Sequence, residues 1–276
     1  MIRQDQPDHT LSKGDLALLG IPFDENSSFM RGAAEAPAKI REALFSGAAN
    51  LCAESGLDLS TDSRFHDAGD LNLSSAHSAF HDIKQAVTTL AEKGVHVLAL
   101  GGDHSITYPL VKATARFHPP FSILHLDAHP DLYHEYDGNR YSHASPFARI
   151  MEEGLVQRLV QVGIRTVNLH QREQAERFGV EIVEMKDWKP ELTFEFDSPL
   201  YVSLDMDVLD PAFAPGVSHH EPGGLSTRDV IAIIQSLNQP VIGADIVEVN
   251  PQRDYEGITA VAAAKLVKEV AAKILN

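Results

Sequence analysis

The sequence predicts an α/β protein with a single-domain, three-layer α/β/α architecture around a mostly parallel, doubly wound sheet. Short apolar runs, each about as long as a buried strand, alternate with longer segments of helical pattern. The runs are almost continuously apolar, as expected for parallel strands covered by helices on both faces. No linker-like stretch or block of charge divides the 276 residues, so we expect one domain over residues 1–276.

Six apolar runs are expected to form the strands of this sheet. They span residues 16–21, 95–100, 122–126, 159–163, 200–204 and 241–246. Their alternation with helical segments predicts a doubly wound sheet. In such sheets the functional site forms at the carboxyl ends of the strands. Residues that directly follow the apolar runs are therefore the first candidates for chemistry.

Helices are expected over residues 36–45, 79–93, 230–237 and 257–275. Pro37 stands near the start of the first of these helices, where proline is tolerated. Gly94 follows the second and is typical of a helix C-cap. The stretch from Ser226 to Asp229 has the pattern of a helix entry into the third.

Composition narrows the class of protein. The formal net charge of -16 disfavours binding to nucleic acid or to an anionic membrane, because both require a basic patch. Cys52 is the only cysteine, which excludes a disulfide framework and a thiolate zinc site. The first ten residues lack the apolar stretch of a signal peptide, and no run has the length of a membrane span. We therefore expect a soluble, cytoplasmic protein.

Acidic and histidine side chains follow four of the expected strands. The clusters are Gly101-Gly102-Asp103-His104-Ser105, Asp127-Ala128-His129-Pro130-Asp131, Asp205-Met206-Asp207 and the single residue Glu248. In extended chain, residues i and i+2 project to the same side, so Asp127 and His129 can converge, as can Asp205 and Asp207. Carboxylates gathered in one pocket repel one another unless cations neutralise them.

Any one of these clusters could instead be a turn, a helix cap or a strand end. Their joint occurrence after buried-strand patterns predicts a metal site. Carboxylates with a few imidazoles and no thiols suit Mn²⁺ better than structural zinc, although nickel, iron or cobalt could use the same ligands. Two such ions can share a water and lower its pKa, which supplies a nucleophile for hydrolysis.

These motifs resemble those of the ureohydrolases, the family of arginase, agmatinase and their relatives. The matching stretches are GGDHS at 101–105, DAHPD at 127–131, SLDMDVLDPAFAPG at 203–216, EPGGLSTRD at 221–229 and DIVEVNPQRD at 245–254. The resemblance covers nearly the whole chain. The stretches NRYSHASPFARI, RLVQVGIR and APGVSHHEPGG are most similar to the plant-type arginases.

The resemblance implies two Mn²⁺ ions per chain, with Ni²⁺ or Co²⁺ as other candidates. Its metal ligands would be His104, Asp127, His129, Asp131, Asp205 and Asp207. One ion would take His104, Asp127, Asp131 and Asp205, and the other Asp127, His129, Asp205 and Asp207. Asp127 and Asp205 would then bridge the pair.

The resemblance also implies the residues that handle the substrate. The implied catalytic residues are His143, Glu248 and Asp131. Glu248 would pair with the flat, cationic guanidinium, which a carboxylate suits well, and His143 would shuttle protons. The implied substrate contacts are Asn26, Asn139, Ser142, Asn168, His219 and again Glu248.

Some neighbouring polar residues have simpler interpretations. Asp103 is expected to have a structural role beside a ligand, and Asp210 to form a turn. His125 lies between two leucines and is interpreted as a buried core histidine. For His219, a place in the guanidinium pocket and a purely loop-filling role are equally favoured.

The implied reaction is hydrolysis of arginine to urea and ornithine. Where animal arginases have Asn and Asp near the far end of the substrate, this chain has Tyr133 and Asn168. Agmatine, which would give urea and putrescine, or another guanidino acid is therefore an alternative substrate. A single-metal deacetylase of similar fold and a non-catalytic subunit are further alternatives. Family members commonly form trimers or hexamers, so a homo-oligomer is expected by analogy.

Overall fold

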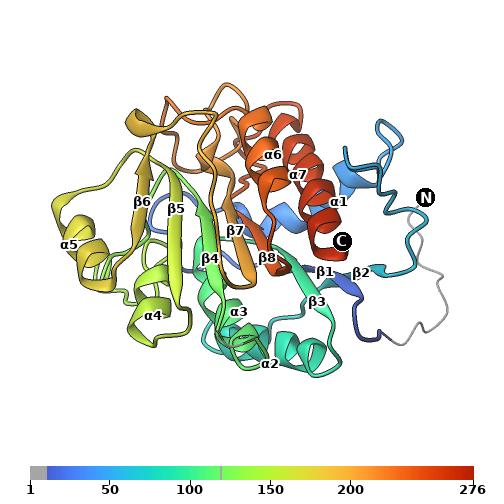
Figure 1. The fold of residues 1–276 in the computed structure, drawn as a ribbon, viewed down its shortest axis with the longest axis horizontal. Coiled ribbons are helices and arrows are strands. Elements are labelled where there is room, and N and C mark those ends of the chain that lie inside the picture. The colour runs from blue at the N-terminus through green and yellow to red at the C-terminus, as the bar shows by residue number, and fades with distance from the viewer. Residues whose placement is uncertain (1–10, 119) are drawn as a thin grey trace.

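In the computed structural model, which describes residues 11–118 and 120–276, every strand belongs to one sheet (Figure 1). The strands are β1 Leu16–Gly20, β2 Phe65–Asp70, β3 His96–Leu100, β4 Ser122–Leu126, β5 Arg158–Ile164, β6 Glu181–Glu184, β7 Leu200–Asp205 and β8 Val241–Val247. The helices are α1 Ala36–Leu44, α2 Ala79–Ala91, α3 Thr107–Thr114, α4 Pro146–Glu152, α5 Leu169–Phe178, α6 Thr227–Ser236 and α7 Ile258–Leu275.

The strand order of the sheet is β2-β1-β3-β8-β7-β4-β5-β6, and each neighbouring pair is parallel. The predicted doubly wound, mostly parallel sheet is therefore confirmed. The chain leaves β3, skips two positions and enters β4; β7 and β8 later fill the gap. As a result, the four strands whose ends carry the acidic and histidine clusters are neighbours in the centre of the sheet.

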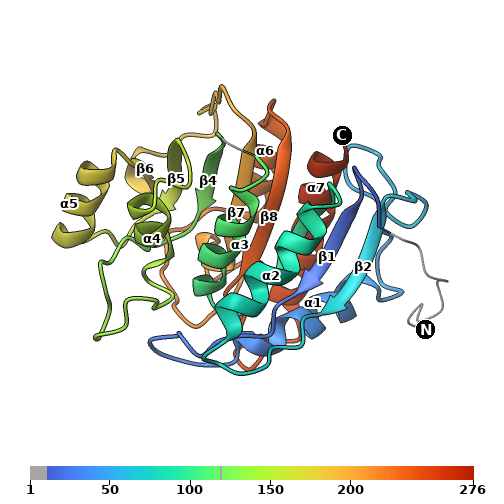
Figure 2. The same cartoon turned by 90° about the horizontal axis from the view of Figure 1, so that it is seen from below.

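Two layers of helices enclose the sheet, as the α/β/α prediction requires. Helices α1, α6 and α7 cover one face and α2, α3 and α4 the other (Figures 1 and 2). Side chains of successive strand residues point to opposite faces. In β4, Leu124 and Leu126 therefore pack in the core of the α1, α6 and α7 layer, while Ile123 packs in the core of the α2, α3 and α4 layer.

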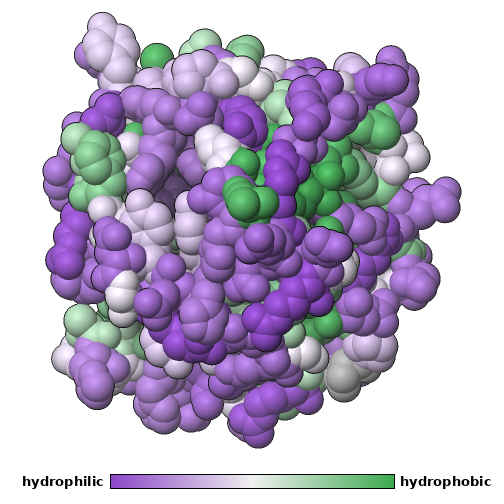
Figure 3. All heavy atoms as spheres, turned by 90° about the vertical axis from the view of Figure 1, so that its left-hand side faces the viewer, coloured by the Kyte–Doolittle hydropathy of each residue, from purple (hydrophilic) through white to green (hydrophobic). Residues whose placement is uncertain are grey.

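The six predicted strands all form, with ends that differ by one residue at most. The sequence reading missed β2 and β6, the two edge strands. Their sequences, FHDAGD and EIVE, are polar or very short, because an edge strand does not need two apolar faces. The end of the molecule that carries β6 and α5 is accordingly mostly hydrophilic, with apolar patches between (Figure 3).

All four predicted helices form, and the predicted entry to α6 is a capping box. The Ser226 side chain accepts from the Asp229 backbone N–H, and the Asp229 carboxylate accepts from the Ser226 backbone N–H. Helices α3, α4 and α5 were missed. Helix α3 is short and buried on nearly all sides, so it lacks a helical alternation of apolar and polar residues, whereas α5 is polar on most of its surface. Within the described residues, no helix is long and apolar enough to cross a membrane.

The turn after β3 depends on a glycine that no other residue can replace without moving the backbone. A Cβ atom on Gly102 would lie 1.8 Å from the Phe23 carbonyl oxygen. The Asp103 N–H donates to that same oxygen at 2.8 Å, and the Glu248 N–H donates to the Gly102 carbonyl at 2.9 Å. Gly102 thus lets the ends of β1, β3 and β8 approach one another.

We predict that Gly102→Ala lowers the free energy of unfolding by about 1–3 kcal/mol, the usual cost of overpacking a closely packed site. Gly47→Ala is the matched control, because a Cβ at Gly47 meets nothing within 4 Å and its backbone is not left-handed. Urea unfolding followed by circular dichroism measures both. Equal stability of the two variants would contradict the proposed close approach.

Candidate metal and catalytic centre

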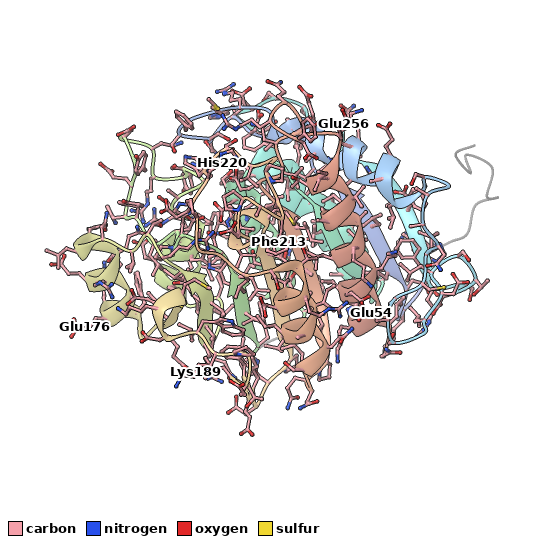
Figure 4. The ribbon with its side chains drawn as sticks, turned by 90° about the horizontal axis from the view of Figure 1, so that it is seen from above. Glu54, Glu176, Lys189, Phe213, His220 and Glu256 are labelled. Atoms are coloured by element: carbon pink, nitrogen blue, oxygen red, sulfur yellow. The ribbon has the colours of Figure 1, made fainter. Side chains whose placement is uncertain are left out.

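The candidate residues lie where the four central strands end. Asp205 is the last residue of β7, Asp127 directly follows β4, and Glu248 directly follows β8. His104 begins a short 3-10 helix after β3. In Figure 4 the loop after β7 carries His220 to one side of the molecule, opposite Lys189, which precedes β7. Parallel strands thus deliver residues that are distant in the sequence to one edge.

The imidazole of His104 lies at the centre of three carboxylates. Its Nδ1 atom is 3.0 Å from Asp131 Oδ2, 3.1 Å from Asp127 Oδ2 and 3.2 Å from Asp205 Oδ2. The ring is fully buried, and Nδ1 has no partner with hydrogen-bond geometry among the described residues. A buried nitrogen surrounded by oxygen atoms in this way is the pattern expected of ligands around a cation.

The far side of the His104 ring fixes which nitrogen points at the carboxylates. Nε2 lies 3.0 Å from Ser203 Oγ, and Ser203 Oγ donates to Asp245 Oδ1 at 2.7 Å. Because the Ser203 proton goes to Asp245, Ser203 accepts the proton of Nε2. Nδ1 is then the nitrogen that faces the three carboxylates. A metal-binding histidine is oriented in this manner in other proteins.

A second group of side chains lies on the other side of Asp127. His129 Nδ1 is 3.0 Å from Asp207 Oδ2 and 3.4 Å from Asp127 Oδ1. Asp127 therefore turns one oxygen to His104 and the other to His129. Asp205 resembles Asp127 in part: its Oδ2 faces His104, and its Oδ1 accepts from the backbone N–H two residues on, that of Asp207.

The electrostatics of this cluster favour bound positive charge. Burial raises the pKa of Asp205 well above its ordinary value, and the neighbouring Asp207 and Asp127 raise it further. Burial lowers the pKa of His104, but the carboxylates of Asp127, Asp131 and Asp205 outweigh burial and raise it well above the ordinary value. A buried site with surplus carboxylates and imidazole nitrogens fits hard or borderline divalent cations.

The prediction that Asp205 and Asp207 converge because both are extended is wrong in its geometry. The strand ends at Asp205, and Met206–Val208 form a 3-10 turn in which the Asp207 N–H donates to Asp205 Oδ1 at 2.8 Å. Both carboxylates still reach the cluster. Two other carboxylates sit on left-handed backbone, Asp131 with φ 51° and Glu248 with φ 65°. Such backbone is costly for these residues and is concentrated at functional sites.

Glu248 and His143 form a buried ion pair beside the cluster. His143 Nδ1 lies 2.7 Å from Glu248 Oε1, which also accepts from the His104 backbone N–H at 2.8 Å. Burial lowers the pKa of His143, but Glu248 outweighs it and the pKa rises to about 9. At Nε2, the imidazole meets Ser28 Oγ at 2.8 Å and the Ser28 N–H at 3.1 Å.

His219 is the one predicted substrate contact besides Glu248 that lies against these side chains. Its ring centroid is 5.2 Å from that of His143 and 5.8 Å from that of His129. Phe29 covers it from outside, with ring centroids 5.6 Å apart. Burial lowers the pKa of His219, and the nearby positive charge of His143 lowers it further. A neutral imidazole at this position can both donate and accept.

The other predicted substrate contacts take part in loop hydrogen bonds. Asn139 Nδ2 donates to Asn26 Oδ1 at 3.1 Å, and Asn26 Nδ2 donates to Ser105 Oγ at 3.1 Å. Ser142 is buried, and its Oγ accepts from the Ala144 backbone N–H. Asn168 caps α5 and donates to the Tyr133 hydroxyl at 2.6 Å. Whether these residues contact a substrate stays a prediction.

His125 has a closer link to the cluster than a core histidine would. It is fully buried, as expected, but its Nε2 lies 2.8 Å from Asp127 Oδ2. Gln161 Nε2 donates to His125 Nδ1 at 2.9 Å, so Nε2 carries the proton and donates to Asp127. The interpretation of His125 as a buried core histidine is therefore correct for its burial but incomplete, because the ring also bonds to the cluster. His125 holds the carboxylate that lies between His104 and His129.

Asp103 and Asp210 have the structural contacts expected of them. Asp103 accepts from the Ser105 and Asn26 backbone N–H groups, which fastens the turn after β3 to the loop after β1. Asp210 accepts from the Ala212 and Gly223 backbone N–H groups in a turn.

Sequence reasoning missed the residues that support His104. Ser203 lies two residues before Asp205 on β7, and a single serine in a strand does not by itself indicate a functional role. Asp245 does give a signal, because it is a carboxylate inside the apolar run of β8. It is fully buried and accepts from Tyr201, Thr107 and Ser203. A buried carboxyl group with three hydroxyl donors indicates a fully satisfied polar network, which here orients His104 through Ser203.

Comparison with known proteins gives one consistent result. The model of the Arginase family matches residues 14–272. "Arginase 1, mitochondrial" of Arabidopsis thaliana is 48% identical over 286 residues, covering 95% of this chain and 82% of that protein. The solved structure of "Arginase from Medicago truncatula" has a TM-score of 0.88 and 44% identity, covering 96% of this chain and 88% of that one.

More distant relatives carry other names. "Agmatinase" of Bacillus anthracis is 33% identical over 272 residues, covering 95% of this chain and 92% of that protein. The family match nevertheless spans nearly all of the residues that form the sheet, its helices and the cluster at the strand ends. The chain belongs to the arginase family of hydrolases, which act on amidine bonds.

Proposed function

We propose that this protein is an arginase, which hydrolyses the guanidinium group of arginine to urea and ornithine. The observation that carries the proposal is Asp127 between two histidines, His104 and His129, with the Glu248–His143 pair alongside. This arrangement provides both a place for two cations and a carboxylate for a cationic substrate. The similarity to plant proteins named arginase supports arginine as the substrate.

The residues proposed to hold the metal ions are those at the ends of β3, β4 and β7. They are His104, Asp127, His129, Asp131, Asp205 and Asp207. Members of this family depend on two metal ions, and we propose Mn²⁺ for both, with Ni²⁺ or Co²⁺ as alternatives. Bound in this way, two cations supply a water of lowered pKa as nucleophile and neutralise the clustered carboxylates.

The protein side chains bind, orient and exchange protons with the substrate. Glu248 Oε2 makes no hydrogen bond with the described residues, whereas Oε1 holds His143 and the His104 backbone. We assign Oε2 to the guanidinium, whose coplanar N–H donors point outward along its edge and suit a carboxylate. His143, with its pKa of about 9, holds a proton at neutral pH that it can give to the departing amine.

Asp131 completes the proposed catalytic set. Its backbone is left-handed, and its carboxylate lies 3.0 Å from His104 Nδ1. Contacts to the far end of the substrate are assigned to Asn26, Asn139, Ser142, Asn168 and His219. Asn168 Oδ1, the atom that could accept from an α-ammonium group, already accepts from the Gln171 backbone N–H at 3.0 Å. Agmatine lacks the carboxylate of arginine and would need fewer polar contacts at this end, so it is the second candidate substrate.

We further propose that the chain is one domain over residues 1–276 and assembles as a trimer or hexamer. One continuous sheet with helices on both faces supports the single domain. The cytoplasmic location expected from the sequence stays a prediction. The similar plant proteins are named mitochondrial or chloroplastic, so the compartment needs its own measurement, by fractionation of the source cells.

The substrate is tested by urea release from arginine, agmatine and guanidinobutyrate in the presence of Mn²⁺. We expect the highest kcat/KM for arginine, and loss of activity on chelation that added Mn²⁺ restores. A higher kcat/KM for agmatine would overturn the arginase assignment. Activity that survives complete removal of metal would overturn the metal-dependent chemistry as well.

The role of Ser203 is tested through metal binding. Ser203→Ala removes the acceptor of the His104 Nε2 proton, so Nδ1 is no longer held toward the carboxylates. We expect metal affinity at one of two sites to fall by about 10–100-fold, as for other residues that orient a ligand. Calorimetric titration of the chelated protein with Mn²⁺ gives affinity and stoichiometry. Ser236→Ala, at the end of α6, is the control, and a stoichiometry of one in the unaltered protein would contradict the two-metal centre.

Glu248→Gln is expected to lower kcat/KM for arginine by about 10²–10⁴-fold, because it removes the charge that pairs with the guanidinium and holds the His143 proton. Glu176→Gln is the control, since this exposed residue of α5 lies at the far end of the molecule (Figure 4). Initial rates of urea formation provide the measurement. Equal kcat/KM in the two variants would refute the assigned role.

A further inference from the structure

A pocket of about 470 Å³ lies beside the proposed catalytic centre and shares only Asn26 and Asn139 with the substrate contacts proposed above. Its walls come from the start of α2, the start of α3 and the loop that follows β4. Figure 2 shows α2 and α3 side by side, with the loops that follow β1, β2 and β4 gathered at one end of them. None of the proposed metal ligands, and neither Glu248 nor His143, lines this pocket.

The pocket is basic on a chain of net charge -16. Its lining includes two lysines, Lys84 and Lys112, and two histidines, His77 and His81. Among the described residues that line it, none is acidic. A concave site with one sign of charge raises the local concentration of ions of the opposite sign. The charge of the lining therefore favours an anion.

The two lysines differ in whether their ammonium groups already have partners within the protein. Lys112 Nζ lies 2.8 Å from Glu153 Oε2 and donates to the Tyr108 hydroxyl at 2.9 Å. Lys84 makes no hydrogen bond or ion pair with a described residue; its charge contributes to the lowered pKa of Glu153 only from a distance. Lys84 is thus the cation most available to a ligand.

Three aromatic rings form an apolar wall of the same pocket. Phe80 lies with its ring centroid 5.7 Å from that of Tyr141 and 6.1 Å from that of Tyr108, and the two tyrosine rings stack at 6.0 Å. Tyr141 is 45% exposed, so part of its ring faces open space. Aromatic faces favour flat apolar groups, with rings offset or edge-on.

From these observations we propose that the pocket is a binding site for a small organic anion, with a carboxylate or phosphate group held by Lys84 and a flat apolar body against Phe80 and Tyr141. Pockets of this volume and mixed lining are typical of small-molecule sites.

The wall of this pocket is also connected to the loop that carries His143. Asn26 and Asn139 line the pocket and are hydrogen-bonded to each other, and the His143 backbone N–H donates to the Asn26 carbonyl at 3.1 Å. A ligand that fixes this wall acts on His143 through the backbone. Because Asn26 and Asn139 are also proposed substrate contacts, its effect should include a change in kcat as well as in KM.

The test uses the metal-loaded enzyme with phenyl phosphate and benzoate as probes. Comparing the two shows whether the pocket binds a phosphate or a carboxylate group. Calorimetric titration should show binding of at least one probe, and Lys84→Gln should weaken it by about tenfold, the effect of losing one charge-assisted hydrogen bond. Lys93→Gln is the matched control, an exposed lysine beyond the end of α2 that does not line the pocket. Both variants should keep the urea-forming activity of the unaltered enzyme without the probe.

A second variant tests the aromatic wall. Tyr141→Ala should weaken binding of phenyl phosphate more than binding of inorganic phosphate, which has no ring. Two results would overturn the proposal. One is equal affinity of the Lys84→Gln and Lys93→Gln enzymes for both probes. The other is inhibition that is purely competitive with the guanidino substrate and unchanged in Lys84→Gln, which would place the anion at the metal centre instead.

Discussion

The structure depends on one electrostatic constraint, the gathering of buried carboxylates around His104 and His129. Asp127, Asp205 and Asp207 are all more than nine-tenths buried, and burial disfavours the charged form of each. The fold brings these groups together at the ends of neighbouring central strands. The positions of the strands fix how close the carboxylates lie. Such a cluster is stable only with compensating positive charge. The sheet that gathers the carboxylates therefore also creates the need for a cation.

The side chains around this cluster mainly orient the histidine and carboxylate groups through hydrogen bonds. Ser203 and Asp245 hold the far nitrogen of His104, and Gln161 with His125 holds Asp127. Each chain of hydrogen bonds starts in a buried strand, so the orientation of the side chain is set by the rigid sheet. The loops contribute the groups proposed to meet the substrate, such as His219 and His143. This division places precise geometry on strands and adaptable contacts on loops.

Much of the fold and of the site was predictable from the sequence for physical reasons. The six inner strands are apolar on both faces, and the capping box of α6 is a local pattern, so both could be recognised. The polar edge strands β2 and β6 lack that signature. The clusters at 103–104, 127–131 and 205–207 were visible because acidic residues directly follow buried strands. Ser203 and Gln161 were not, since their partners lie on other strands and only the register of the sheet brings them together.

The contact between Ser28 and His143 has a consequence for how the loop after β1 behaves. An imidazole with two protons has no lone pair left, so its Nε2 cannot accept from the Ser28 backbone N–H and must instead donate to Ser28 Oγ. Loss of the Nε2 proton frees its lone pair, which can then accept from the Ser28 backbone N–H and from Ser28 Oγ. The loop that also carries Phe29 over His219 is thus hydrogen-bonded to His143 in both protonation states, with the direction of the Ser28 Oγ bond reversed between them.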